Sequence, residues 1–271
     1  MARAASLAIC TVVCFGIFVN LTGSATAGGN RFKVTNVHFE TNSSACDMGI
    51  QIGFDTEGLT EGTVTDPTGH QVYSFKSSAG MKSTGGQTEG FLEGIEPQIR
   101  ELRDALGCPR EREEGQSTLA ELLAVWPSGL YTFAGLHNGT MIEGTDRLTY
   151  RIPAGARVTS PTNGAILPVQ HIVINWKPVT GPILPYLGPV EIVGYHAIVY
   201  ENGGEVTPQL DVDLAATQTS LRVPVQYLKP ATMYLFEVLS TEKSGNQTIT
   251  EGFFCTEGVD SCKAPVRPHH R

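Results

Sequence analysis

The second half of the chain alternates apolar and polar residues in short runs, the pattern of β-strands that bury one face. In the clearest run, Ile172, Ile174 and Trp176 alternate with Val173 and Asn175. Comparable runs lie near residues 193–199, 210–214, 221–223, 234–240 and 249–255. No helical period interrupts them over roughly 100 residues, so we expect residues 157–256 to fold as an immunoglobulin-like β-sandwich.

Alternation also marks the first half, in runs at residues 32–40, 48–54, 62–66, 70–75, 130–135 and 141–152. Pro67-Thr68-Gly69 suits a hairpin turn between two of these runs. Asn138-Gly139 is a strong tight-turn signal between the last two. We therefore expect residues 30–153 to form a second, sandwich-like unit, and the fold class to be mainly β. The boundary between the units is expected near residues 152–155.

Residues 93–126 interrupt the strand pattern and predict a short helical insertion. Apolar residues at helical spacing, with a proline near the start and a glycine just beyond, predict a first helix. These positions are Ile95, Ile99, Leu102 and Leu106, with Pro97 and Gly107. A second helix is expected after Thr118, because Thr118 and Glu121 have the spacing of a capping box.

The two ends of the chain read as an export signal and a tail. Arg3 precedes an apolar stretch at 4–19, and Ala25-Thr26-Ala27 fits the small-x-small pattern of a cleavage site. A membrane span needs roughly 20 apolar residues, so residues 1–27 are expected to be a signal peptide. An uncleaved anchor is the alternative. Residues 257–271 are expected to form a tail, and the mature chain is expected not to insert into a membrane.

Composition narrows the class of function. The chain has 30 glycines and 16 prolines among 271 residues, which favours short strands joined by turns. The net charge of −8 argues against nucleic-acid binding, which needs a basic face. We expect a protein secreted from the cell or held in the periplasm.

Four cysteines remain after the expected signal peptide: Cys46, Cys108, Cys255 and Cys262. In an exported chain they suggest two disulfides, with three possible connectivities. Locality favours Cys46–Cys108 and Cys255–Cys262, because each pair then stays within one half. Free buried thiols are the alternative.

The second half resembles fibronectin type III domains. Leu228-Lys229-Pro230-Ala231-Thr232-Met233-Tyr234 looks like the family's tyrosine corner, in which the phenol packs inward and its hydroxyl bonds the nearby backbone. Trp176, Gly194-Tyr195 and Ser244-Gly245-Asn246 match the family's core tryptophan, third-strand opening and last-hairpin turn. The resemblance implies the fold of residues 157–256 and is nearly silent on function.

A segment of the first half has a resemblance of its own. The sequence at 126–133, WPSGLYTF, resembles a Pro-Gly-Tyr-x-Phe turn and strand. That motif is similar to one in secreted bacterial proteins of unassigned role that carry a C-terminal fibronectin type III domain. The likeness implies export from a Gram-negative cell and says nothing of chemistry.

One loop departs from the fibronectin pattern. Residues 177–189 form a long connection with four prolines that carries Ile183, Leu184, Tyr186 and Leu187. Apolar groups on a stiff loop lose little entropy on binding. We therefore take Ile183, Tyr186 and Leu187 as candidate binding residues. The alternative is that these side chains fold back onto the sandwich or the neighbouring unit.

Catalytic and metal-binding motifs are not found. The sequence has no GxSxG, HExxH, phosphate loop or GxGxxG, so no catalytic residue, metal site or cofactor is assigned. Glu89, Glu93 and Glu96 precede the first expected helix, and we interpret them as favouring its N-terminal dipole. Asp211 and Asp213 are interpreted as the outward face of a strand.

The leading hypothesis is an exported, non-enzymatic protein that binds or adheres through β-sandwich surfaces. Its partner would be another protein, a cell-envelope component or an extracellular polymer. One alternative is a hydrolase, or the accessory of a polymer hydrolase, with an unrecognised site in the first unit near Glu89, Glu93 or His38. A second alternative is a structural spacer.

Overall fold

The structure is a computed structural model that describes residues 32–109, 116–203 and 209–264. The expected signal peptide at 1–27 and the end of the expected tail, 265–271, lie outside the described residues. No helix within the described ranges is long and apolar enough to cross a membrane.

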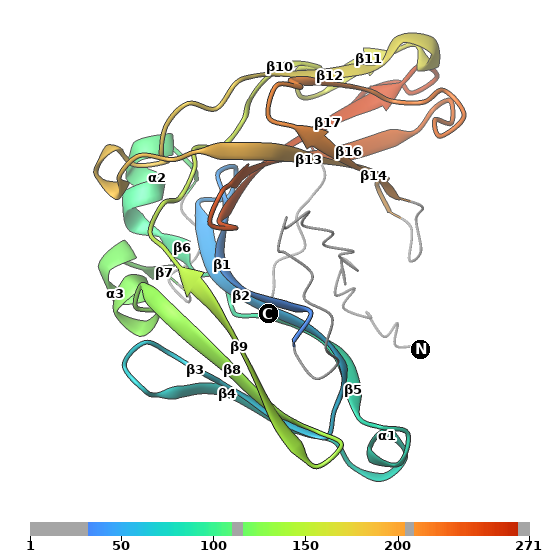
Figure 1. The fold of residues 1–271 in the computed structure, drawn as a ribbon. Helices are drawn as coiled ribbons and strands as arrows, with labels where there is room; N and C mark the ends of the chain where they lie inside the picture. Colours follow the sequence, from blue (N-terminus) through green and yellow to red (C-terminus); the bar gives the residue numbers. More distant parts are fainter. Residues whose placement is uncertain (1–31, 110–115, 204–208, 265–271) are drawn as a thin grey trace, which may run out of the picture.

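A long, curved sheet runs through both halves of the chain (Figure 1). Its strand order is β14-β13-β16-β17-β1-β2-β6-β7, with β5 also paired to β2 and β11 to β17. The first-half strands are β1 (Val34–Asn42), β2 (Asp47–Leu59), β5 (Gln87–Glu93), β6 (Gln98–Ile99) and β7 (Gln116–Ser117). The second-half strands are β11 (Ala165–Leu167), β13 (Ile192–Glu201), β14 (Gln209–Ala215), β16 (Met233–Glu242) and β17 (Gln247–Thr256).

A four-stranded sheet covers the first half of the long sheet (Figure 1). It contains β3 (Glu61–Thr65), β4 (Gln71–Lys76), β8 (Gly129–His137) and β9 (Thr140–Leu148), in the order β4-β3-β8-β9. Strand β1 packs against β9, and β2 against β8. Alternate residues of β1 and β8, such as Val37, Phe39, Tyr131 and Phe133, are buried in the first core. Both expected hairpins are confirmed.

A three-stranded sheet covers the second half. It contains β10 (Arg157–Ser160), β12 (Val173–Lys177) and β15 (Ser220–Arg222). Trp176 packs edge-on against Tyr195 at 5.4 Å in the second core. Two short 3-10 turns, η1 (Val169–His171) and η2 (Pro185–Leu187), lie in the connections. The expected fold class, mainly β with two sandwich units, is confirmed by these paired sheets.

The tyrosine corner forms as the resemblance implied. Tyr234 is 1% exposed and stacks on Phe254 with ring centroids 5.5 Å apart. Its hydroxyl oxygen accepts a 2.8 Å hydrogen bond from the Lys229 amide. The side chain thereby satisfies its polar end at the corner while its ring fills the core.

The two halves are joined by hydrogen bonds as well as by the chain. Strands β1 and β17 pair in parallel, with Glu40 opposite Gln247 and Asn42 opposite Ile249. The linker between the two halves, which runs from the end of β9 to the start of β10, is also hydrogen-bonded to β16 and β17. Ser240 Oγ donates to the Ala154 carbonyl, and Thr248 Oγ1 donates to the Pro153 carbonyl. The alternating runs predict a separate first unit, and no local pattern in the sequence indicates this pairing.

The segment between β5 and β8 contains shorter helices than expected. They are α2 (Arg100–Leu106) and α3 (Leu119–Val125), and a further short helix, α1 (Ala79–Ser83), lies between β4 and β5. The capping box of α3 is confirmed, since Thr118 Oγ1 accepts from the Glu121 amide at 3.1 Å. The predicted helical face from Ile95 was wrong: Ile95 is 92% exposed and Ile99 pairs in β6. Helix α2 begins only at Arg100.

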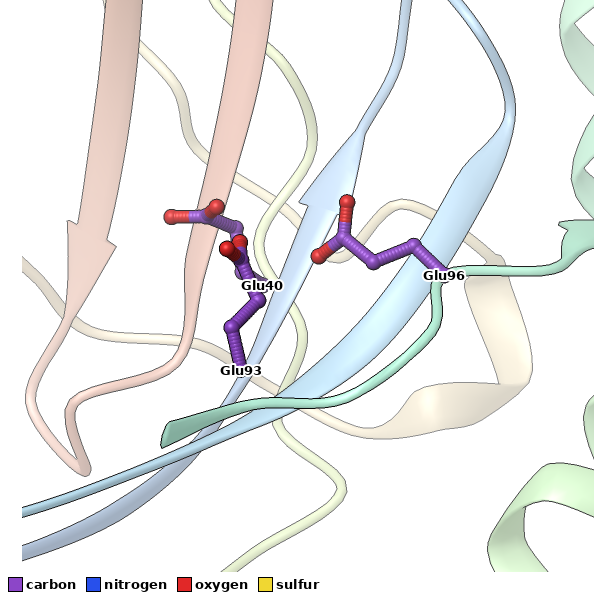
Figure 2. Close-up of side chains that lie close together, drawn as sticks. All are labelled: Glu40, Glu93 and Glu96. Carbon is purple, nitrogen blue, oxygen red and sulfur yellow. The ribbon is translucent and has the colours of Figure 1, made fainter. Parts of the chain in front are cut away.

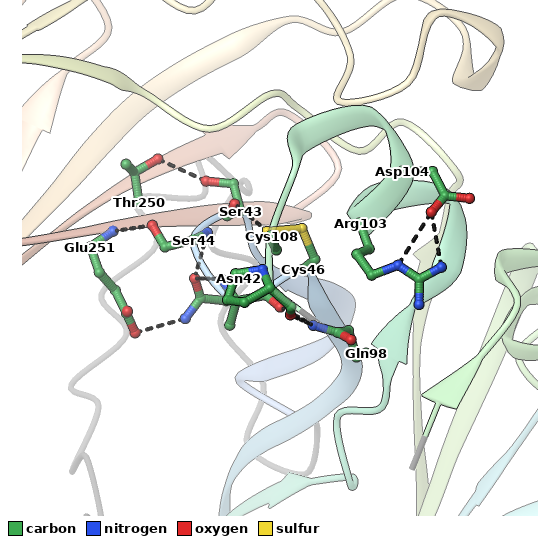
Figure 3. The surroundings of a disulfide bond; sticks show 12 residues. Asn42, Ser43, Ser44, Cys46, Gln98, Arg103, Asp104, Cys108, Thr250 and Glu251 are labelled. Atoms are coloured by element: carbon green, nitrogen blue, oxygen red, sulfur yellow. Dashed lines mark hydrogen bonds and ion pairs between the residues drawn. A yellow bond between two sulfur atoms is a disulfide. The ribbon is translucent and has the colours of Figure 1, made fainter. Parts of the chain in front are cut away.

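Both disulfides favoured by locality are present, Cys46–Cys108 and Cys255–Cys262. The first ties the turn between β1 and β2 to the segment just after α2 (Figure 3). Beside it, Gln98 Nε2 donates to the Ala45 carbonyl at 3.1 Å. The second links β17 to the segment that follows it. Disulfides of this kind are typical of oxidising compartments.

Candidate functional site: a proline-rich loop and an acidic cluster

The proline-rich loop is anchored in the core of the other half of the chain. Ile183 is 8% exposed and Leu184 is 4% exposed, and both belong to the first hydrophobic core. The Ile183 amide donates to the Ile152 carbonyl at 3.0 Å. Ile183 therefore cannot contact a partner without leaving the core, and its assignment as a binding residue is corrected.

The next residues of the loop divide between core and surface. Leu187 is partly buried against the first core, so it also serves mainly to anchor the loop. Tyr186 is 66% exposed on the short turn η2. Burial of part of its ring and the Glu101 carboxylate raise the pKa of Tyr186. Of the three candidate binding residues, Tyr186 alone presents a large free surface.

A hollow of about 320 Å³ lies beside this loop, which we call the loop hollow. One wall is formed by Leu187, Gly188 and Pro189, and the other by the end of β9 and the residues that follow it. The full lining is Ser128, Gly129, Arg147, Leu148, Thr149, Tyr150, Arg151, Leu187, Gly188 and Pro189. Its volume falls at the small end of the range for ligand sites.

Two arginines line the loop hollow, Arg147 and Arg151. Within the part of the chain that the structure describes, neither forms an ion pair with a carboxylate. Tyr150 also lines the hollow, and its hydroxyl accepts from the Ser128 amide at 3.0 Å and donates to the Leu123 carbonyl at 2.9 Å. These bonds hold the Tyr150 side chain in place.

A second feature is a cluster of three carboxylates, which we call the acidic cluster: Glu40, Glu93 and Glu96 (Figure 2). One carboxylate oxygen from each residue lies within 4.8 Å of the others. Glu40 comes from β1, Glu93 ends β5, and Glu96 lies in the segment between β5 and β6. Glu40 is 5% exposed.

Strand register explains why these residues meet. Glu40 pairs with Gly49 on β2, and Glu93 pairs with Gln51 two residues further along β2. Because residues two apart share a face, their side chains gather on one side of the sheet. Gly49 leaves room for the third carboxylate: a Cβ at this position would lie 2.6 Å from Glu96 Cγ.

Two amides border the acidic cluster. Gln247 Nε2 donates to Glu40, and Gln51 Nε2 donates to Glu93 Oε1 at 3.3 Å. Gln51 is 1% exposed, and its side chain also hydrogen-bonds that of His38, the residue opposite it on β1. Glu96 Oε1 is buried without a hydrogen-bond partner among the described residues.

Burial and mutual repulsion perturb the acids. Burial first, and then the Glu93 carboxylate, raise the pKa of Glu40 to about 8. Burial first, and then Glu40, Asp47 and Glu93, raise the pKa of Glu96 to about 9. Glu40 and Glu96 therefore resist carrying a negative charge in this cluster.

The acidic cluster corrects the interpretation of Glu89, Glu93 and Glu96 as partners of a helix dipole. Glu89 and Glu93 lie on β5, and the helix begins only at Arg100. Local spacing could not reveal the cluster, since Glu40 is remote in sequence. The other acidic pair behaves as expected, because Asp211 lies on the polar face of β14 and contacts His196.

Comparisons with known proteins add little to this geometry. No family model matches the chain, and no curated protein matches it. Among solved structures, a two-domain fibronectin type III segment of chicken tenascin is similar at 12% sequence identity. The match covers 83% of this chain and 98% of that one, with a TM-score of 0.26. The sandwich architecture is therefore established by the strand pairing itself.

Proposed function

We propose that the chain is an exported, non-enzymatic binding protein whose loop hollow receives an anionic group of an envelope or extracellular polymer. The observation that carries the proposal is the pair Arg147 and Arg151, which line a hollow beside the proline-rich loop and have no carboxylate partner among the described residues. Arginine binds carboxylate and phosphate groups through paired, charge-assisted hydrogen bonds. A hollow with two such side chains suits a repeating anionic polymer.

The stiffness of the loop supports binding. Ile183 and Leu184 fix its first part in the core, so the wall at Gly188 and Pro189 loses little freedom when a ligand binds. Tyr186 stands next to that wall in sequence and offers an exposed ring, which suits stacking on a sugar or packing against a partner. The net charge of −8 repels anions in general, so capture depends on this local basic site.

Export is part of the same proposal. It is supported by the signal-like residues 1–27 and by two disulfides, which persist in oxidising compartments. The proposed location is outside the cell or in the periplasm. Kinship with secreted bacterial proteins that end in a fibronectin type III domain is supported by the sequence at 126–133.

Binding to immobilised polymers tests the proposal. The probes are polygalacturonate for carboxylate, polyphosphate for phosphate and dextran as a neutral control. We expect the protein to bind one anionic probe and not dextran, with affinity that falls as salt rises. The double variant Arg147→Gln/Arg151→Gln should weaken binding at least tenfold, and Tyr186→Ser by a few fold.

The matched control is Arg157→Gln/Arg222→Gln, which removes the same charge from exposed positions on the three-stranded sheet. This control should bind within about twofold of the unmodified protein, because neither arginine lines the hollow and salt screens exposed charges that do not touch the ligand. Equal loss in both double variants would overturn the loop hollow as the site. Failure to bind any anionic probe would favour the spacer alternative, and shortening of a probe would favour the hydrolase.

A further inference from the structure

We propose that residues 265–271 dock on the concave face of the long sheet, the face that points away from both hydrophobic cores. The segment has the sequence PVRPHHR, which contains Arg267 and Arg271 and no acid. It lies outside the described residues, so the proposal is built from the face that would receive it. This docking is distinct from the loop hollow and does not depend on the function proposed for it.

Strand register defines the concave face. Thr41 on β1 pairs with Thr248 on β17, so the alternate residues that fill the two cores lie on one and the same side of the sheet. Glu40 and Gln247 form the neighbouring pair and therefore point to the other side. Both smaller sheets cover the core side, and no strand or helix that the structure describes lies over the concave face (Figure 1).

Two apolar side chains on the concave face are nevertheless buried. Ile198 on β13 and Leu239 on β16 each lie next to residues of the second core in sequence, so they point away from that core. They are 1% and 0% exposed and belong to neither hydrophobic core. Apolar side chains on a sheet face call for a covering element. Pro265 and Val266 offer apolar surface for this purpose.

The charge of the concave face complements the two arginines. Glu237 and Glu251 lie opposite each other on β16 and β17, and the acidic cluster lies further along the same face. Burial and the Glu93 carboxylate raise the pKa of Glu40, and an arginine placed beside these acids acts in the opposite direction. The acids on this face are Glu40, Glu93, Glu96, Asp211, Asp213, Glu237 and Glu251.

The described chain ends close to this face. A disulfide ties Cys262 to Cys255 near the end of β17. A Cβ at Gly164 would lie 3.0 Å from the Cys262 carbonyl oxygen and 3.7 Å from the Phe253 ring, so Cys262 and Phe253 are neighbours. Phe253 faces the concave side, because Phe254 beside it lies in the second core. The described residues end two positions after Cys262.

The segment is long enough to follow β17 across the joint between the halves. An extended chain spans about 3.3–3.6 Å per residue, so seven residues reach about 23–25 Å. The stretch of β17 from Phe253 back to Gln247 is about 20 Å long, at about 3.3 Å per residue. The segment can therefore run from the Phe253 end of β17 to its pairing with β1.

The spacing of the two arginines matches that of the acids along this path. Arg267 and Arg271 are four residues apart, as are Glu251 and Gln247 on β17. Glu40 pairs with Gln247 and belongs to the acidic cluster. With the segment extended along β17, Arg267 at Glu251 therefore brings Arg271 to the acidic cluster.

Zero-length cross-linking tests the docking directly. Arg267→Lys/Arg271→Lys keeps both charges and supplies amines, which a carbodiimide joins to carboxylates in contact with them. Mass spectrometry should find links from position 267 to Glu237 or Glu251, and from position 271 to the acidic cluster. Absence of links, or links only to acids outside the concave face, would overturn the proposal. In a mixture of ¹⁴N and ¹⁵N protein, links between copies would also overturn it, because they assign the segment to a neighbouring molecule.

Release of the segment by trypsin supplies a test with a matched control. Trypsin cleaves after Lys263, and docking should slow this cleavage. Glu93→Gln/Glu251→Gln should make it about fivefold faster, because the variant removes two partly exposed ion-pair partners. Glu61→Gln/Glu143→Gln removes the same charge from the four-stranded sheet and should leave the rate unchanged. Equal rates in the two double variants would reject the concave face as the docking site.

Truncation after residue 264 identifies what covers the apolar part of the face. The truncated protein keeps both disulfides and both cores. It should bind the dye anilinonaphthalene sulfonate more strongly than the unmodified protein, because Ile198 and Leu239 become exposed. The free peptide PVRPHHR at about 1 mM, the effective concentration of a tethered segment, should reverse the increase. Unchanged dye binding after truncation would show that another element covers these side chains, and the docking would be rejected.

Discussion

At the scale of single residues, Asn246 connects three segments of the chain. Its side chain is fully buried in the turn between β16 and β17. Its Oδ1 accepts from the Phe39 amide on β1 at 2.9 Å. Its Nδ2 donates to the carbonyls of Thr149 and Arg151 in the linker, at 2.9 and 3.1 Å. One amide thus holds β1, the linker and the last hairpin in place.

Asn246→Ala should therefore be strongly destabilising. The change leaves the Phe39 amide and two linker carbonyls without their partner, and each buried group costs about 1–3 kcal/mol when unsatisfied. We expect the free energy of unfolding in urea to fall by about 3–4 kcal/mol. Asn163→Ala is the matched control, because Asn163 also accepts from a strand amide, that of Phe253, but at an exposed site. A similar, small loss in both variants would contradict the role given to Asn246.

At the scale of elements, β16 and β17 place two acids opposite each other, Glu237 and Glu251. Burial is the main cause that raises the pKa of Glu237 to about 7. The Tyr200 hydroxyl on β13 acts in the opposite direction, because it donates to the Glu237 carboxylate at 3.0 Å. Glu251 raises this pKa further and His196 lowers it. The folded protein thus holds a proton on Glu237 that the unfolded chain releases near pH 4.5.

Protonation of Glu237 makes the stability of the protein depend on pH in a direction that can be predicted. Because the pKa of Glu237 is higher in the folded protein than in the unfolded chain, its protonation stabilises the fold fully below about pH 4.5. This contribution to stability is lost as pH rises through about 7. The loss is on the order of 3 kcal/mol. Glu237→Gln imitates the protonated acid, so it should be more stable than the unmodified protein at pH 7.5 and close to it at pH 4.5. Urea unfolding across this range measures the difference, and a constant difference would contradict the assignment.

Local signals in the sequence predicted elements well. Asn138-Gly139 predicted a hairpin turn, and Thr118 with Glu121 predicted a helix start. Both were confirmed because the interactions that form a turn or a helix cap lie within a few neighbouring residues. Glu96 shows the limit: its neighbours in sequence suggest a helix, but its position is set by Gly49 across the sheet. The partners of Glu40 depend on the register of three strands, which no local pattern specifies.

At the scale of the whole molecule, the sequence predicts two sandwiches, and the structure makes them share one sheet. The alternating runs predict each strand because alternation is a local property. The parallel pairing of β1 with β17 joins residues 207 positions apart, such as Glu40 and Gln247. Nothing in either strand alone selects that partner. Two units that resemble independent domains in sequence are therefore coupled through the middle of a sheet.

This coupling predicts one cooperative unfolding transition. Opening either half exposes the edge of β1 or β17 and breaks the bonds from Ser240 and Thr248 to the linker. Differential scanning calorimetry should give one peak, with equal calorimetric and van't Hoff enthalpies. Ser240→Ala/Thr248→Val removes both linker bonds and should lower the Tm and broaden or split the peak. Thr159→Val, which removes an exposed hydroxyl bonded to the Asn175 carbonyl, is the control and should leave one peak. Two resolved peaks in the unmodified protein would show that the halves unfold independently despite the shared sheet.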